Sequence, residues 1–171
     1  MLSAMMINSM IVKGLVFSFY FQSTVISQAK NIENHALLGE WRCGPYTMTG
    51  EGFEVTVTEA VVYRIDGSYE STSDLTLRLE SGRVVRTKDR AFGSWGIDEG
   101  IIEVRYSKVK FLWSDDPTYT IEMGQHDADA QLRAKSWSKA KIVRLDEKLI
   151  TTTVEPMYEG AKTTVMCVRP K

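Results

Sequence analysis

The residues of this chain that could take part in catalysis are few. Its 171 residues include two histidines, His35 and His126, and two cysteines, Cys43 and Cys167. Nucleophilic catalysis needs a serine or cysteine activated by a neighbouring base. The sequence contains neither a Gly-x-Ser-x-Gly elbow nor a Cys-x-x-Cys motif, and His35 falls in a polar stretch before the first expected strand. We therefore expect a protein that is not an enzyme.

Carboxylates are more numerous, but their positions indicate turns. Three acidic pairs fall at expected turns: Asp98 with Glu99, Asp115 with Asp116, and Asp146 with Glu147. Turn chemistry explains such pairs without a general acid or base. The stretch His126-Asp127-Ala128-Asp129 offers one nitrogen and two oxygens, but no second cluster completes a zinc-type ligand set. The sequence predicts neither a metal site nor a cofactor.

Aromatic residues with strand periodicity are the first candidates for a binding function. They are Tyr63, Tyr69, Trp95, Tyr106, Phe111 and Trp113. Around the inside of a barrel they would line an apolar cavity with polar groups, and the small Ser136, Ser138 and Ala140 would leave room for a ligand. The alternative is that these rings fill the core, as they do in many small barrels.

A basic stripe around a tryptophan is the second candidate. If residues 132–145 form a strand, one face carries Arg133, Lys135, Trp137, Lys139 and Lys141. Such a ridge would suit an acidic protein, a polyanion or lipid headgroups. The alternative is a solvated outer face. If the segment is helical, the stripe disperses.

The elements that would position these residues have the period-two pattern of half-buried strands. Phe53, Val55 and Val57 alternate with polar residues, and a second alternation runs through residues 75–80. Between them, Asp66-Gly67 predicts a two-residue hairpin turn with positive φ at both positions. In residues 101–113 the apolar phase slips by one residue at Ser107-Lys108, which predicts a β-bulge.

The segment after Pro117 is harder to assign. Tyr119, Ile121 and Met123 alternate as in a strand, and residues 124–131 are polar and predict a loop. Residues 132–145 fit a strand or a helix, and we favour a strand from about Ser136 after a helical turn near residues 129–134. In total we expect one all-β domain, an up-and-down antiparallel barrel or strongly curved meander of about eight to ten strands.

The first 29 residues predict a secretory signal peptide. Lys13 supplies the positive region, residues 14–26 the apolar centre and Ser27-Gln28-Ala29 the cleavage site. An apolar run of about 13 residues is shorter than the roughly 20 of a spanning helix, so stable membrane insertion is not expected. We thus expect an exported protein, periplasmic or secreted, whose single domain covers residues 30–171.

The net charge of the mature chain restricts the classes of partner, and the cysteines indicate the compartment. Without the leader the chain has 20 basic and 22 acidic residues, a net charge of −2, which gives no general attraction to nucleic acid. In an oxidising compartment Cys43 and Cys167 are expected to form a disulfide between the first and last strands. Two free thiols are the alternative.

Three short segments resemble those of the lipocalins and the wider lipocalin-like (calycin) group of small barrels in bacterial exported proteins. Gly39-Glu40-Trp41 resembles the Gly-x-Trp motif of the first strand, and residues 63–69 and 93–102 resemble the hairpin and Gly-x-Trp segments of bacterial lipocalin-like domains. The resemblance implies that Trp41 plugs the barrel floor and that a late arginine, Arg144 or Arg169, covers it. Residues 116–119 do not match the Thr-Asp-Tyr motif of true lipocalins, so no specific ligand is implied.

Together these features predict a non-enzymatic exported protein that holds a small apolar or amphipathic ligand in its barrel. The alternative is a protein-interaction module, such as an inhibitor or immunity-type protein, that acts through its outer surface or loops. The sequence specifies no oligomeric state.

Overall fold

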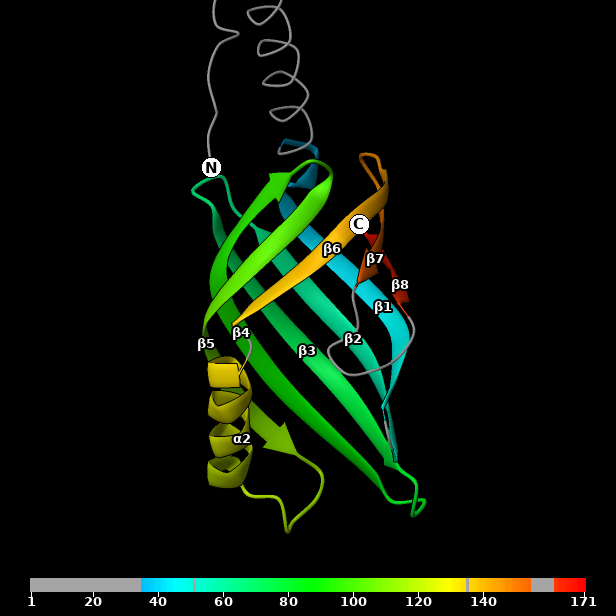
Figure 1. The fold of residues 1–171 in the computed structure, drawn as a ribbon, viewed down its shortest axis with the longest axis vertical. Helices are drawn as coiled ribbons and strands as arrows, with labels where there is room; N and C mark the ends of the chain where they lie inside the picture. Colours follow the sequence, from blue (N-terminus) through cyan, green and yellow to red (C-terminus); the bar gives the residue numbers. More distant parts are fainter. Residues whose placement is uncertain (1–34, 51, 135, 155–161) are drawn as a thin grey trace, which may run out of the picture.

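The computed structural model describes residues 35–50, 52–134, 136–154 and 162–171, in which eight antiparallel strands form a closed barrel (Figure 1). Each strand pairs with the next in sequence, and β8 returns to β1. The elements are β1 (Gly39–Gly50), β2 (Phe53–Tyr63), β3 (Ser68–Leu79), β4 (Val84–Asp98), β5 (Ile101–Ser114), α2 (Ile121–Ala134), β6 (Trp137–Leu145), β7 (Leu149–Val154) and β8 (Thr163–Val168). The all-β, up-and-down barrel is confirmed. The expected signal segment, residues 1–29, and Lys135 lie outside the described residues.

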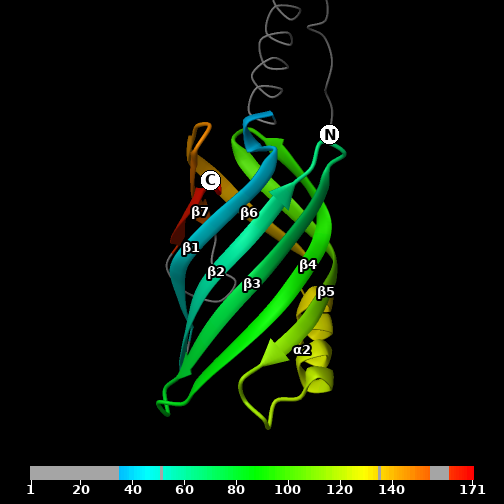
Figure 2. The ribbon, with the colours of Figure 1, turned by 180° about the vertical axis from the view of Figure 1, so that it is seen from behind.

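Strands β1 to β5 form a long curved wall (Figure 2). The residues on its inner face follow the predicted alternation. On β2 the inward positions are odd-numbered from Phe53 to Tyr63, and the unbroken β2–β3 register places Val57 opposite Leu75 and Val61 opposite Ser71. The same phase continues onto β4, where Ala91, Trp95 and Ile97 face inward. Strand β4 runs without interruption from Val84 to Asp98.

The turns at Asp66-Gly67 and Glu99-Gly100 differ in backbone geometry. Gly67 has φ 79° and its N–H donates to the carbonyl of Arg64 at 3.0 Å, but Asp66 is not among the residues with positive φ. This is a type I turn followed by a left-handed glycine, so the prediction of two positive φ angles at Asp66-Gly67 is wrong. That geometry occurs instead at Glu99-Gly100, with φ 50° and 73°. Asp66 contributes through its side chain, which accepts a bond from the Ser68 N–H at 2.8 Å.

The predicted bulge at Ser107 is confirmed. Phe92 pairs with Lys108 and Gly93 pairs with Tyr106, so Ser107 has no partner in the ladder. A second irregularity leaves out Leu112, because Asp89 pairs with Phe111 and Lys88 with Trp113. Bulges of this kind raise the local twist and help a sheet to close.

The predicted strand through Tyr119, Ile121 and Met123 and the predicted loop over residues 124–131 are both wrong. Residues Ile121–Ala134 form the helix α2, which lies beside the lower part of β5 in Figure 1. Thr120 caps its first turn by accepting a bond from the Met123 N–H at 3.2 Å. Strand β6 then begins at Trp137, close to the expected Ser136. Among the described residues, no helix is long and apolar enough to cross a membrane.

Polar contacts dock α2, because β6 pairs with β5 only from Ile101 to Arg105 and leaves the rest of that edge free. The Gln125 side chain accepts from the Phe111 N–H at 3.0 Å and donates to the Val109 carbonyl at 2.9 Å. A primary amide thus replaces a strand at the open edge. Gly124 allows the approach, since a Cβ there would overlap the Phe111 ring.

The barrel closes between β8 and β1 across two residue pairs, Arg42 with Val168 and Cys43 with Cys167. The cysteines form the expected disulfide, with an S–S distance of 2.05 Å. The cross-link spans 124 residues of sequence, so it removes much of the conformational entropy of the unfolded chain.

We expect the Cys43→Ala/Cys167→Ala double variant to lose about 5 kcal/mol of unfolding free energy, the chain-entropy value for a loop of this length. Urea unfolding followed by circular dichroism measures the loss. The native protein under reducing conditions is the matched comparison and should lose a similar amount. Equal stability of the oxidised and reduced proteins would contradict the expectation.

Candidate ligand-binding site in the barrel interior

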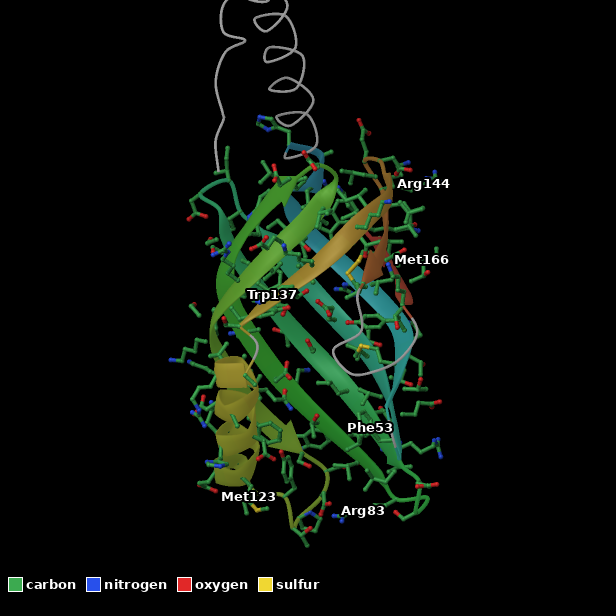
Figure 3. The ribbon with its side chains drawn as sticks, viewed as in Figure 1. Phe53, Arg83, Met123, Trp137, Arg144 and Met166 are labelled. Carbon is green, nitrogen blue, oxygen red and sulfur yellow. A yellow bond between two sulfur atoms is a disulfide. The ribbon has the colours of Figure 1, made fainter. Side chains whose placement is uncertain are left out.

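One end of the barrel is sealed by Trp41. Its side chain is fully buried, and its indole N–H donates to the Leu37 carbonyl at 2.7 Å. Arg169 lies over the indole with its guanidinium carbon 4.2 Å from the ring centre. Its Nη2 donates to the Ala36 carbonyl at 2.8 Å and its Nε to the Glu147 carbonyl at 2.7 Å. Of the two candidate arginines, Arg169 covers the tryptophan, whereas Arg144 pairs with Asp146 on the surface (Figure 3).

Four of the six predicted ligand-binding aromatics meet just inside this floor. Tyr63 contacts the Tyr69 ring at 5.6 Å between centroids and the Trp95 ring at 5.2 Å. Tyr69 in turn contacts Tyr106 at 5.9 Å. All three contacts are tilted or edge-to-face, the arrangement that aromatic rings prefer.

A glycine makes this aromatic packing fit. Gly93 lies between Tyr69 on β3 and Tyr106 on β5 in the strand register. A Cβ at Gly93 would collide with the backbone of Arg105, so the two strands approach closely at this point. The tyrosine rings on either side then meet across the position that has no side chain.

The other two predicted residues lie elsewhere. Phe111 packs against Tyr119 at 5.5 Å, near the start of α2. Trp113 pairs with the outward-facing Lys88 and is 49% exposed, so it lies on the outer wall. The second bulge, at Leu112, is what turns Trp113 outward.

The most notable interior residues were not predicted. Glu59 on β2 and Asp89 on β4 both point inward, and both pair with Ser73 on the strand between them. Two strand spacings therefore separate their backbones, roughly 10 Å. We call these acids, together with Tyr46, Tyr63, Tyr69 and Tyr106, the tyrosine–carboxylate cluster.

Burial raises the pKa of Glu59 above its ordinary value, and contacts from the hydroxyls of Tyr46 and Tyr69 act in the opposite direction. The Tyr46 hydroxyl donates to Oε2 of Glu59 at 2.8 Å. Burial, and then the charge of Glu59, raise the pKa of Asp89 to about 6, while a contact from Ser73 opposes the shift. The carboxyl group of Asp89 therefore titrates not far below neutral pH.

The same negative field acts on the tyrosines. Burial and the charge of Glu59 raise the pKa of Tyr106 to about 12 and raise the pKa values of Tyr63 and Tyr69 above their ordinary values. These phenols stay protonated at neutral pH. They supply hydroxyl groups and neutral ring faces to the interior.

Several residues of the cluster are only partly covered. Val61 and Ile150 near the floor are covered, whereas Glu59, Asp89 and Tyr106 point inward and still keep some exposed surface. Tyr63 is also partly covered, and among the described residues its hydroxyl has no hydrogen-bond partner. This hydroxyl can therefore form a hydrogen bond with a bound molecule.

Beyond the cluster, toward the end that carries the β1–β2 and β3–β4 turns, the inner wall becomes apolar. Inward positions there are held by Met48, Val55, Leu75, Leu77 and Val109, each only partly covered. The barrel thus offers a polar middle next to an apolar wall.

A sequence signal for the two acids existed. Glu59 and Asp89 both occupy the inward phase of otherwise apolar or small residues: Glu59 stands between Val57 and Val61, and Asp89 stands two residues before Ala91. An acid in the buried phase of a strand is uncommon unless it is paired or functional.

The basic stripe is not one strand face. Arg133 belongs to α2, and Lys135 is outside the described residues. Trp137, 45% exposed on the outside of the barrel, Lys139 and Lys141 remain on β6 (Figure 3). Lys139 lies 5.4 Å from the Trp137 ring centre and pairs with Glu103 at 3.5 Å, so part of its charge is already matched.

The remaining candidate groups have local partners. Asp127 accepts from the Tyr119 hydroxyl at 2.6 Å, and Asp129 accepts from Gln125 at 2.9 Å, both at α2. Within the described residues, no group of three or more His, Cys, Asp or Glu side chains is arranged to hold a metal ion. An open depression of about 260 Å³ beside Trp95 is bordered by Glu103 and Arg105, which pair with each other. The polar groups of the barrel interior differ from these, because Glu59 and Asp89 have no basic partner among the described residues.

Compared with known proteins, the sequence matches no protein-family model and no curated protein. The class of this protein is therefore defined by its fold, a closed eight-stranded up-and-down antiparallel β-barrel. The inward-facing acids and tyrosines distinguish its interior from a purely apolar one.

We expect Arg169→Ala to lower the free energy of unfolding by about 2 to 3 kcal/mol, because it removes a cation–π contact and two hydrogen bonds to backbone carbonyls. Arg144→Ala is the matched control and should change it by less than about 1 kcal/mol, as for exposed ion pairs. Chemical denaturation of both variants provides the comparison. Equal losses would show that covering Trp41 contributes nothing specific.

The raised pKa of Asp89 predicts a pH-dependent stability. The folded state binds this proton more tightly than the unfolded state, whose pKa is the ordinary 3.8. The stabilisation is therefore complete below pH 4 and is lost as the pH rises to about 6 and beyond. Asp89→Asn should leave stability unchanged at pH 4 and raise it at pH 7.5, by up to about 3 kcal/mol.

Urea unfolding at several pH values measures this difference between the variant and the native protein. Glu54→Gln, on the exposed face of β2, is the control and should give a difference that does not change with pH. A pH-independent effect of Asp89→Asn would mean that the carboxyl titrates normally in the folded state.

Proposed function

We propose that this protein is an exported, non-enzymatic, lipocalin-like carrier that holds a small amphipathic molecule inside its barrel. The observation that carries the proposal is the layered interior: a floor sealed by Trp41, then the tyrosine–carboxylate cluster, then the apolar wall. Pockets for small molecules combine a mostly apolar lining with a few placed polar groups, and this interior has both.

The two layers favour an amphipathic ligand over a purely apolar one. A hydrocarbon placed against Glu59 and Asp89 would take water away from two carboxyl groups and offer them no further hydrogen bond, which is costly. A ligand whose polar end reaches the cluster satisfies these groups while its apolar part covers residues such as Leu75 and Leu77. The open hydroxyl of Tyr63 adds one more position for a hydrogen bond.

Carriage is favoured over catalysis because the buried acids have no reactive companion. Serines near the cluster, Ser71 and Ser73, have no histidine beside them, since the only histidines of the chain are His35 and His126. The disulfide suits the export inferred from the leader sequence. The stacking of Arg169 over Trp41 supports the lipocalin-like assignment.

The alternative, a protein-interaction module, has less support. The ridge that would have carried it is divided between α2 and β6, and Lys139 is engaged with Glu103. A solidly packed barrel interior that binds no ligand would favour this alternative.

A substitution that fills the interior should block binding. N-phenyl-1-naphthylamine, a neutral probe that fluoresces in apolar surroundings, should bind the native protein, and Ser73→Phe should weaken binding at least tenfold. Thr72→Phe, one residue away on the outer face, should stay within twofold of the native protein. Fluorescence titration measures all three.

Equal binding by both variants would place the probe on the outer surface and contradict the carrier proposal. Native mass spectrometry of the protein from its own source extends the test. An adduct present in the native protein and absent from Ser73→Phe would give the mass of the natural ligand.

A further inference from the structure

The charges of the barrel wall are sorted by sign between its two faces. In the strand register of the described residues, the basic side chains of the eight strands fall on outward positions, among them Arg42, Arg86, Lys88, Arg90, Lys110 and Lys139. The charged residues at inward positions are Glu59 and Asp89, both acidic. Arg169, which lies on the same face, is held over Trp41 at the floor by its bonds to the Ala36 and Glu147 carbonyls. Among the described residues, Glu59 and Asp89 therefore have no basic side chain paired with them.

Acids on the outer face have the partners that the inner acids lack. Glu70 pairs with Arg64 at 2.7 Å and Asp74 with Lys88 at 3.1 Å. Glu59 is contacted by neutral hydroxyl groups, and Asp89 by Ser73. A buried carboxylate without a cation is costly, and a cation brought by a ligand would remove that cost.

The rings beside the acids are also suited to a cation. Tyr63, Tyr69 and Tyr106 form one contacting group within reach of the charge of Glu59, as its effect on their pKa values shows. Faces of aromatic rings attract organic cations, and cages of such rings next to acids recognise ammonium groups. The Tyr63 hydroxyl, which has no hydrogen-bond partner among the described residues, can accept a hydrogen bond from the same group.

Resting on the carrier function proposed above, we infer that the ligand is an organic cation: an amphipathic amine whose ammonium group lies between Glu59 and Asp89, against the tyrosine rings, with its apolar part along the Val55–Leu77 wall. A neutral alcohol would satisfy hydrogen bonds and leave the charge unmatched. An anion would bring its negative charge next to two acidic side chains.

Displacement of N-phenyl-1-naphthylamine by three ten-carbon probes tests this inference. At pH 7.5 decylamine should displace the dye at a concentration at least tenfold lower than 1-decanol, and decanoate should be the weakest. In Glu59→Gln and Asp89→Asn this advantage should fall to threefold or less while 1-decanol binds as before. Glu54→Gln, on the outer face of the same strand as Glu59, should keep the full advantage.

A titration of the native protein gives the same test without any substitution. Between pH 7.5 and pH 5 decylamine stays protonated, whereas Asp89, with its pKa of about 6, takes up a proton. The advantage of decylamine over 1-decanol should therefore shrink several-fold over this range. Because this arm uses the native chain, it holds even if an interior variant fails to fold.

The possible outcomes separate the two proposals. If the dye binds and 1-decanol or decanoate displaces it at the same concentration as decylamine, the cation inference is overturned. The carrier function then still stands. Failure of both the dye and decylamine to bind, by fluorescence and by calorimetry, would overturn both. A decylamine preference that both variants retain would place the cation site outside the cluster and also overturn the inference.

Discussion

The short junction between β1 and β8 is the contact on which the rest of the barrel depends. Two residue pairs close it, and the disulfide between Cys43 and Cys167 is one of them. Trp41 stands two residues before Cys43, and Arg169 two residues after Cys167. In an antiparallel pair these positions are opposite each other and on the same face as the disulfide. The closing pair therefore also assembles the floor, with Arg169 stacked on Trp41.

The same junction leads directly to the tyrosine–carboxylate cluster. Cys43 pairs on its other side with Glu59, which pairs with Ser73, which pairs with Asp89. The disulfide and both acids therefore lie in one row of directly paired residues across β1 to β4. An acid placed here costs stability, because enclosure disfavours the charged form. The disulfide beside it offsets part of that cost, because it removes conformational entropy from the unfolded chain.

Away from the junction the barrel is held differently. Strand β6 leaves β5 after five residue pairs, and α2 covers the remaining edge through the Gln125 amide. An uncovered edge would invite pairing with another chain. The helix therefore protects the part of the wall that carries the apolar inner face, although it buries little apolar surface of its own.

The chain by itself determined the strand pattern, the bulge at Ser107, the disulfide and the four clustered aromatics, because each follows from period-two alternation or from residue type. The sequence also determines which arginine covers Trp41. Once Cys43 pairs with Cys167, antiparallel register places Arg169, and not Arg144, opposite Trp41. The helix α2 could not be predicted in this way, since Gln125 and Gly124 dock it by a polar contact and a close approach instead of an apolar stripe.

The tertiary structure alone decided which charges share the interior. Glu59 and Asp89 are 30 residues apart in the sequence, and only the pairing of β2, β3 and β4 brings them to either side of Ser73. It also turned Trp113 outward, through a bulge at Leu112. The residue types around Leu112 give no sign of this bulge. Alternation indicates which face of a strand is buried, but the neighbours across that face are set by register, and register arises only when the strands pair.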